Sequence, residues 1–175
     1  MKKGKMIIFT LLMTLVMTLF VTGCANKKEE LVFDSKEGSF TLSVDHSAGY
    51  KISTDSKDFR SSREQAMLIG KDFSIGIEFN DDLDYFFEGD FEKLKKTRVE
   101  ENKATEVTYS NIKGIQYFYD GYMNYNVILP IEGSNKYTLN LSVYGKDETK
   151  EAAKEAIESK EVVDILNNIK DIKLK

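Results

Sequence analysis

The chain has 175 residues and a formal charge of −4 at neutral pH, and it contains one histidine, one cysteine and one proline. One histidine cannot supply the several His or Cys ligands of a zinc site, so we expect no metal centre and no cofactor. The acidic balance argues against nucleic acid as a partner, because phosphate backbones attract clusters of Lys and Arg.

The first segment carries Lys2, Lys3 and Lys5, followed by an apolar run over residues 6–21. A basic start, an apolar run and small residues after it are typical of a secretory signal peptide. The run has 16 residues, whereas a permanent membrane-spanning helix needs about 20. We therefore expect residues 1–23 to be a cleaved signal peptide.

The apolar run ends at Val21 and is followed by Thr22, Gly23 and Cys24. These four residues resemble the lipobox of bacterial prolipoproteins. The resemblance implies cleavage between Gly23 and Cys24 and a diacylglycerol on the Cys24 sulfur. Two acyl chains anchor a protein stably, so we expect lipid anchoring at the extracytoplasmic face of the cell membrane. An alternative is that cleaved residues 15–23 act as a secreted peptide pheromone.

Cleavage before Cys24 removes three lysines and no acid, leaving 152 residues with 22 basic and 29 acidic side chains and a formal charge of −7. Cys24 is the only cysteine, so the domain must fold without an internal disulfide. Residues 24–37 are mostly polar and predict a tether that ends in a short strand near residues 31–33. Residues 38–175 then form a single domain.

Three segments alternate strictly between apolar and polar residues, which predicts strands with one face on a core. The segments are residues 40–44, 73–79 and 137–143. Weaker patterns predict further strands at residues 50–53, 65–70, 105–110 and 112–119. Short connections favour an antiparallel sheet.

Helical spacing occurs in two regions. Between residues 82 and 102, apolar residues recur every three or four positions, Asp81 or Asp82 can cap the start, and Gly89 is the point at which the helix would divide. Residues 147–159 predict a second helix. Ser159 can cap a further helical piece that carries Leu166 and Ile169, before a final strand at residues 171–174.

This order of elements predicts an α+β fold with an antiparallel sheet flanked by helices. The opening Phe40 and Leu42, followed by Gly49, Tyr50 and Lys51 after a loop, resembles the start of the PsbP-like α/β/α sandwich. The resemblance covers residues 38–174. It implies a domain without enzymatic activity that acts in binding or assembly.

Asp120 and Gly121 predict a two-residue hairpin turn, which would set Tyr119 opposite Tyr122 and Phe118 opposite Met123. One face of this hairpin would then face the core with Phe118, Met123, Tyr125, Val127 and Leu129. The other face holds a candidate partner-binding surface of Tyr117, Tyr119, Tyr122, Asn124 and Asn126. Tyrosine offers a large contact area at low entropic cost. The alternative is that a helix covers these residues or that they only stabilise the sheet.

Catalytic motifs are scarce. With Cys24 acylated, His46 has no cysteine partner, and no Gly-x-Ser-x-Gly sequence occurs, so we predict no catalytic residues and expect His46 in an exposed loop. The acids between positions 81 and 90 lack the EF-hand spacing. Solvated acids at a helix start explain this run, with a calcium site as the alternative.

These observations predict a membrane-tethered, non-enzymatic module that binds a protein, peptide or small ligand. The alternative is an envelope hydrolase that uses a pair of carboxylates, because the fold alone decides which acids lie close together. A concave pocket holding two close carboxylates would favour the hydrolase.

Overall fold

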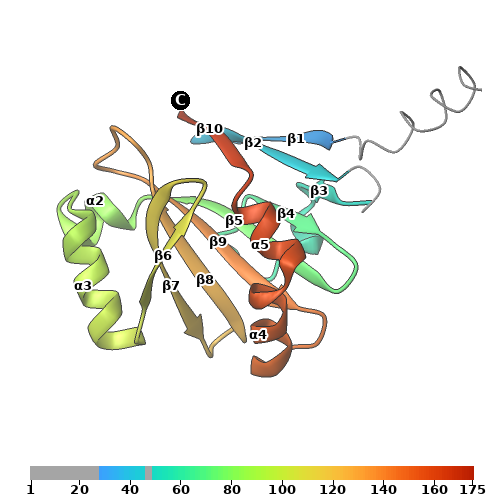
Figure 1. The fold of residues 1–175 in the computed structure, drawn as a ribbon. Helices are drawn as coiled ribbons and strands as arrows, with labels where there is room; N and C mark the ends of the chain where they lie inside the picture. Colours follow the sequence, from blue (N-terminus) through green and yellow to red (C-terminus); the bar gives the residue numbers. More distant parts are fainter. Residues whose placement is uncertain (1–27, 46–48) are drawn as a thin grey trace, which may run out of the picture.

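The computed structural model describes residues 28–45 and 49–175, and the chain forms two antiparallel sheets with helices on both sides of the larger one (Figure 1). The seven-stranded sheet has the order β3-β4-β5-β9-β8-β7-β6, and the three-stranded sheet has the order β1-β2-β10. The predicted α+β fold is thus confirmed. The strands are β1 Lys28–Asp34, β2 Gly38–Asp45, β3 Lys51–Ser53, β4 Ala66–Ile69, β5 Phe73–Asn80, β6 Thr105–Tyr109, β7 Ile112–Tyr119, β8 Asn124–Pro130, β9 Thr138–Gly145 and β10 Ile169–Leu174.

The described residues form four α-helices, arranged as two consecutive pairs, α2 with α3 and α4 with α5, and a capping residue separates the two helices of each pair. Gly89, at φ 77°, follows the first helix, and the Asp90 side chain accepts hydrogen bonds from the first turn of the next one. Ser159 caps the last helix as predicted. The helices are α2 Asp82–Phe87, α3 Phe91–Asn102, α4 Lys150–Glu158 and α5 Lys160–Leu166, and a 3-10 turn lies at Ser56–Asp58.

One face of the seven-stranded sheet, which we call the inner face, carries the main core. It packs against the small sheet and against α4 and α5. The strict alternation of β5 and β9 places their apolar side chains on this face, in register with each other. Of the predicted core residues, Tyr137 is half-buried and the others are buried; those are Phe40, Leu42, Val44, Phe73, Ile75, Ile77, Phe79, Leu139, Leu141 and Val143.

The opposite face of the sheet, which we call the open face, is covered over Gly76 by the loop before β4 and at one end by two helices. There α2 and α3 bury Leu83, Phe87 and Leu94 against Ile115 and Ile128 of the sheet. The same alternation that directs apolar residues inward places polar ones on the open face, including Glu78, Asn140 and Ser142. This uncovered polar area becomes the candidate site.

Two boundaries differ from the sequence prediction. Strand β1 pairs with β2 along its whole length, and Phe33 is 1% exposed, so the part of the predicted tether from residue 28 onward belongs to the folded domain. The polar residues of this segment misled the prediction because they form the outer side of an edge strand. Ile169 starts β10 rather than continuing the last helix, since α5 ends at Leu166.

The predicted signal peptide at residues 1–23, Cys24 and His46 lie outside the described residues. Within the part of the chain that the structure describes, no helix has the length and apolar composition needed to cross a membrane.

Candidate functional site

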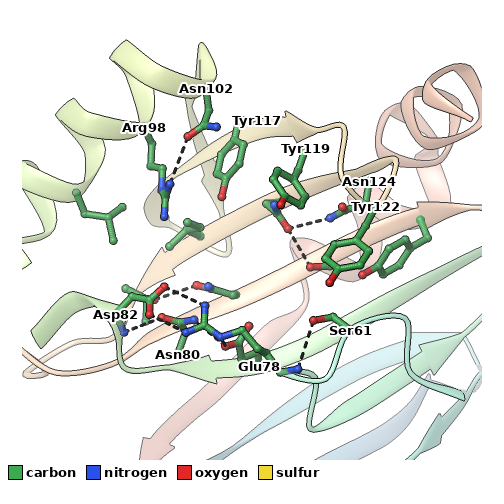
Figure 2. Close-up of a pocket in the computed structure, with 18 of the residues that line it drawn as sticks. Ser61, Glu78, Asn80, Asp82, Arg98, Asn102, Tyr117, Tyr119, Tyr122 and Asn124 are labelled. Atoms are coloured by element: carbon green, nitrogen blue, oxygen red, sulfur yellow. Dashed lines mark hydrogen bonds and ion pairs between the residues drawn. The ribbon is translucent and has the colours of Figure 1, made fainter. Parts of the chain in front are cut away.

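A polar cavity of about 390 Å³ lies on the open face. Its floor is formed by side chains of β5, β9, β8 and β7, and α3 and the loop before β4 rise at its sides. Figure 2 shows Arg98, Asn102, Tyr117 and Tyr119 on one side and Glu78, Asn80 and Asp82 on the other. Ligand pockets usually measure about 300–1,000 Å³, so the cavity has the size of a small-ligand site.

All five residues of the predicted surface line this cavity. Tyr119 and Tyr122 stand at the rim, 39% and 50% exposed, whereas Tyr117 is 8% and Asn124 1% exposed. Asn126 is half-buried on the floor. Of the five predicted residues, only Tyr119 and Tyr122 are therefore exposed, whereas Tyr117 and Asn124 are buried at the floor of the cavity.

The hairpin that carries these residues has a different turn from the predicted one. Tyr119 lies opposite Asn124 rather than Tyr122, and the loop holds four residues, including Met123 at φ 50°. Gly121 is not at the positive φ that the predicted turn type needs; it instead lets the Tyr119 ring lie across the loop, since a Cβ there would come within 2.7 Å of that ring.

The change of register is two residues, and this preserves the faces because side chains alternate with a period of two. The tyrosines and asparagines therefore remain on the open face. Met123 was predicted to face the core, and this prediction is wrong, because Met123 lies in the loop and is exposed. Val127 and Leu129 are in the main core, Tyr125 packs on it, and Phe118 is half-buried beside Tyr125.

Amide groups order the floor of the cavity. Asn126 Oδ1 accepts hydrogen bonds from Asn124 Nδ2 at 2.8 Å and from Ser142 Oγ at 2.9 Å, and Thr138 Oγ1 donates to Asn140 Oδ1 at 2.9 Å. Asn124 Oδ1 is buried and meets no donor among the described residues. A buried acceptor without a donor lowers stability by about 1–3 kcal/mol. A ligand that donates a hydrogen bond to this oxygen would therefore bind more tightly.

The side of the cavity toward β5 is charged, and the sequence did not single out its residues as a group. Arg63 donates to both carboxylate oxygens of Asp82, at 2.8 and 3.2 Å, and its Nε lies 3.5 Å from Glu78. Asn80 donates to Glu78 at 2.6 Å and accepts from the backbone of Asp82 at 2.7 Å. Asp81 occupies the N-cap position of α2, as predicted, but its side chain makes no capping hydrogen bond. Asn80, one residue earlier, supplies the acceptor for the first turn instead.

The loop that carries Arg63 is held against the sheet by a buried carboxylate. Glu64 accepts hydrogen bonds from the backbone N–H groups of Arg60 and Ser61 and, at 2.7 Å, from the Tyr144 hydroxyl. It lies over Gly76, where a Cβ would come within 2.0 Å of Glu64 Oε1. Burial and the bond to Glu64 raise the pKa of Tyr144, so this phenol remains a donor.

On the opposite side, α3 positions Arg98 over the Tyr117 ring, 5.8 Å from its centroid. Arg98 Nη1 donates to Asn102 at 3.4 Å, whereas Arg98 Nε is buried and has no acceptor in the described part of the chain. Burial raises the pKa of Tyr117, which keeps its hydroxyl protonated at neutral pH.

A second cavity of about 190 Å³ adjoins the first. The two share Tyr122 and Tyr144 as lining residues. The far side of the second cavity is formed by Arg60 and Glu148, which are joined by an ion pair. The open face therefore offers two adjoining depressions that share Tyr122 and Tyr144 in their linings.

The acids between positions 81 and 90 are separated by their contacts. Asp82 binds Arg63, Asp90 caps α3, and Glu88 pairs with Lys93 at 3.0 Å. Among residues 28–45 and 49–175, no three acidic, histidine or cysteine side chains gather as a possible metal site. These contacts give the calcium alternative no support.

No family model, curated protein or solved structure matches this chain.

Glu78 gives the site a pH dependence. Burial raises its pKa from 4.5 to about 7, against the opposing effects of Asn80 and Arg63, with Asp82 and Glu64 as the nearby acids. Between these pH values the folded state holds a proton that the unfolded chain has released, so the free energy of unfolding falls as pH rises. We expect Glu78 to contribute a decrease of roughly 2–3 kcal/mol across this window.

Glu78→Gln should remove this contribution, because the amide imitates the protonated acid and does not titrate. Urea unfolding of both proteins at about pH 5 and about pH 8 measures it. Equal pH dependence in the two proteins would show that Glu78 titrates normally.

Proposed function

We propose that the protein is a lipid-anchored, extracytoplasmic lipoprotein whose domain is a non-enzymatic binding module. The observation that carries this proposal is the polar cavity on the open face. Tyr119 and Tyr122 form its rim, asparagines form its floor, and Arg63 with Asp82 and Glu78 forms its charged side. Most of these side chains are already held by hydrogen bonds to one another. Such preorganisation lowers the entropic cost of binding.

A binding role explains the open face better than a structural one. Polar side chains that only keep a sheet face soluble are expected to point into open solvent. Here they line a concave cavity, and Asn124 Oδ1 is buried without a donor among the described residues. The PsbP-like resemblance of residues 38–174 points in the same direction, since it implies binding or assembly. Cys24 would place the module at the membrane surface.

The hydrolase is the second candidate, and one observation favours it. Glu78 and Asp82 line the same cavity, and the pKa of Glu78 is raised to about 7, as suits a general acid. Against it, Asp82 is held by two hydrogen bonds from Arg63. A ligand that the wild type binds and leaves chemically unchanged would support the binding module, whereas turnover that is lost in Glu78→Gln would support the hydrolase.

A thermal-shift screen of the mature protein tests the pocket. The panel comprises amino acids, short peptides, nucleosides and saccharides at millimolar concentration. We expect at least one class to raise Tm, and the Tyr119→Ala and Tyr122→Ala variants to bind that class about tenfold more weakly.

Tyr85→Ala is the matched control, because Tyr85 is an exposed tyrosine on α2 that lines neither cavity. It should bind like the wild type. If no class raises Tm, or if the rise persists unchanged in the rim variants, the pocket is not a binding site.

Cys24→Ala tests the anchor. Without the thiol no diacylglycerol can be attached, so we expect incorporation of a labelled fatty acid to disappear and the protein to leave the lipid-anchored membrane fraction. Cys24 precedes the first described strand, which begins at Lys28, so we expect the Tm of the domain to stay unchanged. Retained label in this variant would contradict lipidation at Cys24.

A further inference from the structure

The geometry points to a neutral saccharide as the ligand of this pocket, with one sugar unit in the larger cavity and a second in the adjoining one. This inference rests on the proposed binding function and specifies its ligand class. Four observations carry it: the charge of the lining, its hydrogen-bonding groups, the rim tyrosines and the adjacency of the two cavities.

The acidic side chains in the larger cavity are already compensated, whereas Arg98 makes no ion pair with any described residue. Among the described residues, its charged lining side chains are Arg63, Arg98, Glu78 and Asp82. Arg63 binds Asp82 with two hydrogen bonds and also contacts Glu78, and Arg98 lies over Tyr117. A cationic ligand would bring a charge that lacks a free partner, and burying an unpaired charge is costly. An anionic group could pair only with Arg98, which already lies over the Tyr117 ring. A neutral ligand avoids the cost of burying an unpaired charge.

The unsatisfied groups of the cavity require a ligand that both donates and accepts. Asn124 Oδ1 needs a donor and Arg98 Nε needs an acceptor, since neither has a partner in the described part of the chain. The floor amides and hydroxyls likewise offer both kinds of group. A hydroxyl carries a donor and an acceptor on one atom, so a ligand with several hydroxyls can serve both Asn124 Oδ1 and Arg98 Nε.

The rim provides the apolar complement that a sugar ring needs. The Tyr119 and Tyr122 rings lie 5.8 Å apart with an interplanar angle of 50°, and both are partly exposed beside the polar floor. An aromatic face carries partial negative charge, so the C–H groups on one side of a pyranose can pack against it while the hydroxyls reach the asparagines.

The two adjoining cavities favour an elongated ligand. Tyr122 and Tyr144 belong to both, and the smaller one ends at the pair of Arg60 and Glu148. A ring resting on Tyr122 can continue into the smaller cavity as a second unit. Arg60 contributes its side chain only to the smaller cavity, and so it can separate the two subsites experimentally.

A peptide fits this face less well. Extended peptides commonly bind by adding a strand to a sheet edge, but β9 and β8 at the floor are paired with neighbours on both sides. The floor therefore offers side-chain amides and hydroxyls rather than a free backbone edge.

Calorimetric titration of the mature protein tests the inference. The probes are glucose and N-acetylglucosamine, their neutral β-linked di- to tetrasaccharides, the charged analogues glucuronic acid and glucosamine, and a set of tetrapeptides. We expect a neutral disaccharide to bind about tenfold more tightly than its monosaccharide and than either charged analogue. Tyr119→Ala and Tyr122→Ala should each weaken disaccharide binding about tenfold, and Tyr85→Ala should leave it unchanged.

Arg60→Ala should weaken the disaccharide and leave the monosaccharide unchanged. Equal affinity for one and two units, insensitive to this variant, would overturn the second subsite. Binding of only peptides or charged compounds, lost in the rim variants, would overturn the saccharide and keep the binding function. Absence of binding by every probe at millimolar concentration, or binding indifferent to the rim variants, would overturn both.

Discussion

Phe33→Ala is expected to lower the free energy of unfolding by about 3–5 kcal/mol. Phe33 is buried in the main core, where its ring lies 5.2 Å from that of Phe40 and 5.9 Å from that of Phe79. Truncation removes both ring contacts and leaves a cavity between the two sheets. Urea unfolding followed by circular dichroism measures the change.

Val32→Ala is the matched control, since the neighbouring side chain of the same strand points to solvent. It should change the free energy of unfolding by less than about 0.5 kcal/mol. The pair distinguishes a strand that belongs to the domain from a tether. Small losses in both variants would mean that the folded domain starts after residue 34, as the polar composition of the segment suggested.

Glu64→Ala is expected to lower the free energy of unfolding by about 3 kcal/mol, because three donors lose their acceptor at once. These donors are the backbone N–H groups of Arg60 and Ser61 and the buried Tyr144 hydroxyl. The loop would detach from the sheet and carry Arg63 away from Asp82. Unfolding in urea and the affinity of any pocket ligand should therefore change together.

Two comparisons make this result specific. Glu64→Gln retains an acceptor oxygen and should lose only about 1 kcal/mol. Glu148→Ala removes an exposed acid that pairs with Arg60 at the surface and should cost at most about 1 kcal/mol. A loss of the same small size in all three variants would show that Glu64 does not hold the loop.

The strands and the inward faces were predictable because alternation is a local property. β5 and β9 alternate so regularly that the sequence identifies which of their faces is apolar and packs on the main core. The tyrosine and asparagine side of the β7–β8 hairpin followed from the same rule, and an error of two residues in the register left it intact. The turn itself was mispredicted because Asp-Gly favours a tight turn locally, whereas the Tyr119 ring folds across Gly121.

No pattern in the sequence predicted the charged side of the cavity. Arg63, Glu78 and Asp82 come from a loop, a strand and a helix start, and nothing in their spacing indicates that they meet. Glu64 and Tyr144 are 80 positions apart. A glycine within a strand, such as Gly76, has no evident purpose in the sequence. The structure shows that a side chain at this position would collide with Glu64.

The sequence by itself thus determined the α+β class, the strand faces and the tyrosine and asparagine surface, and it alone carries the lipobox prediction at Cys24. These properties depend on residues adjacent in the chain or on a period of two. Tertiary structure alone decided that β1 belongs to the core, that the open face is concave, and that Glu78 lies buried beside Arg63. Those outcomes depend on contacts between distant segments, which pack only when the whole sheet is assembled.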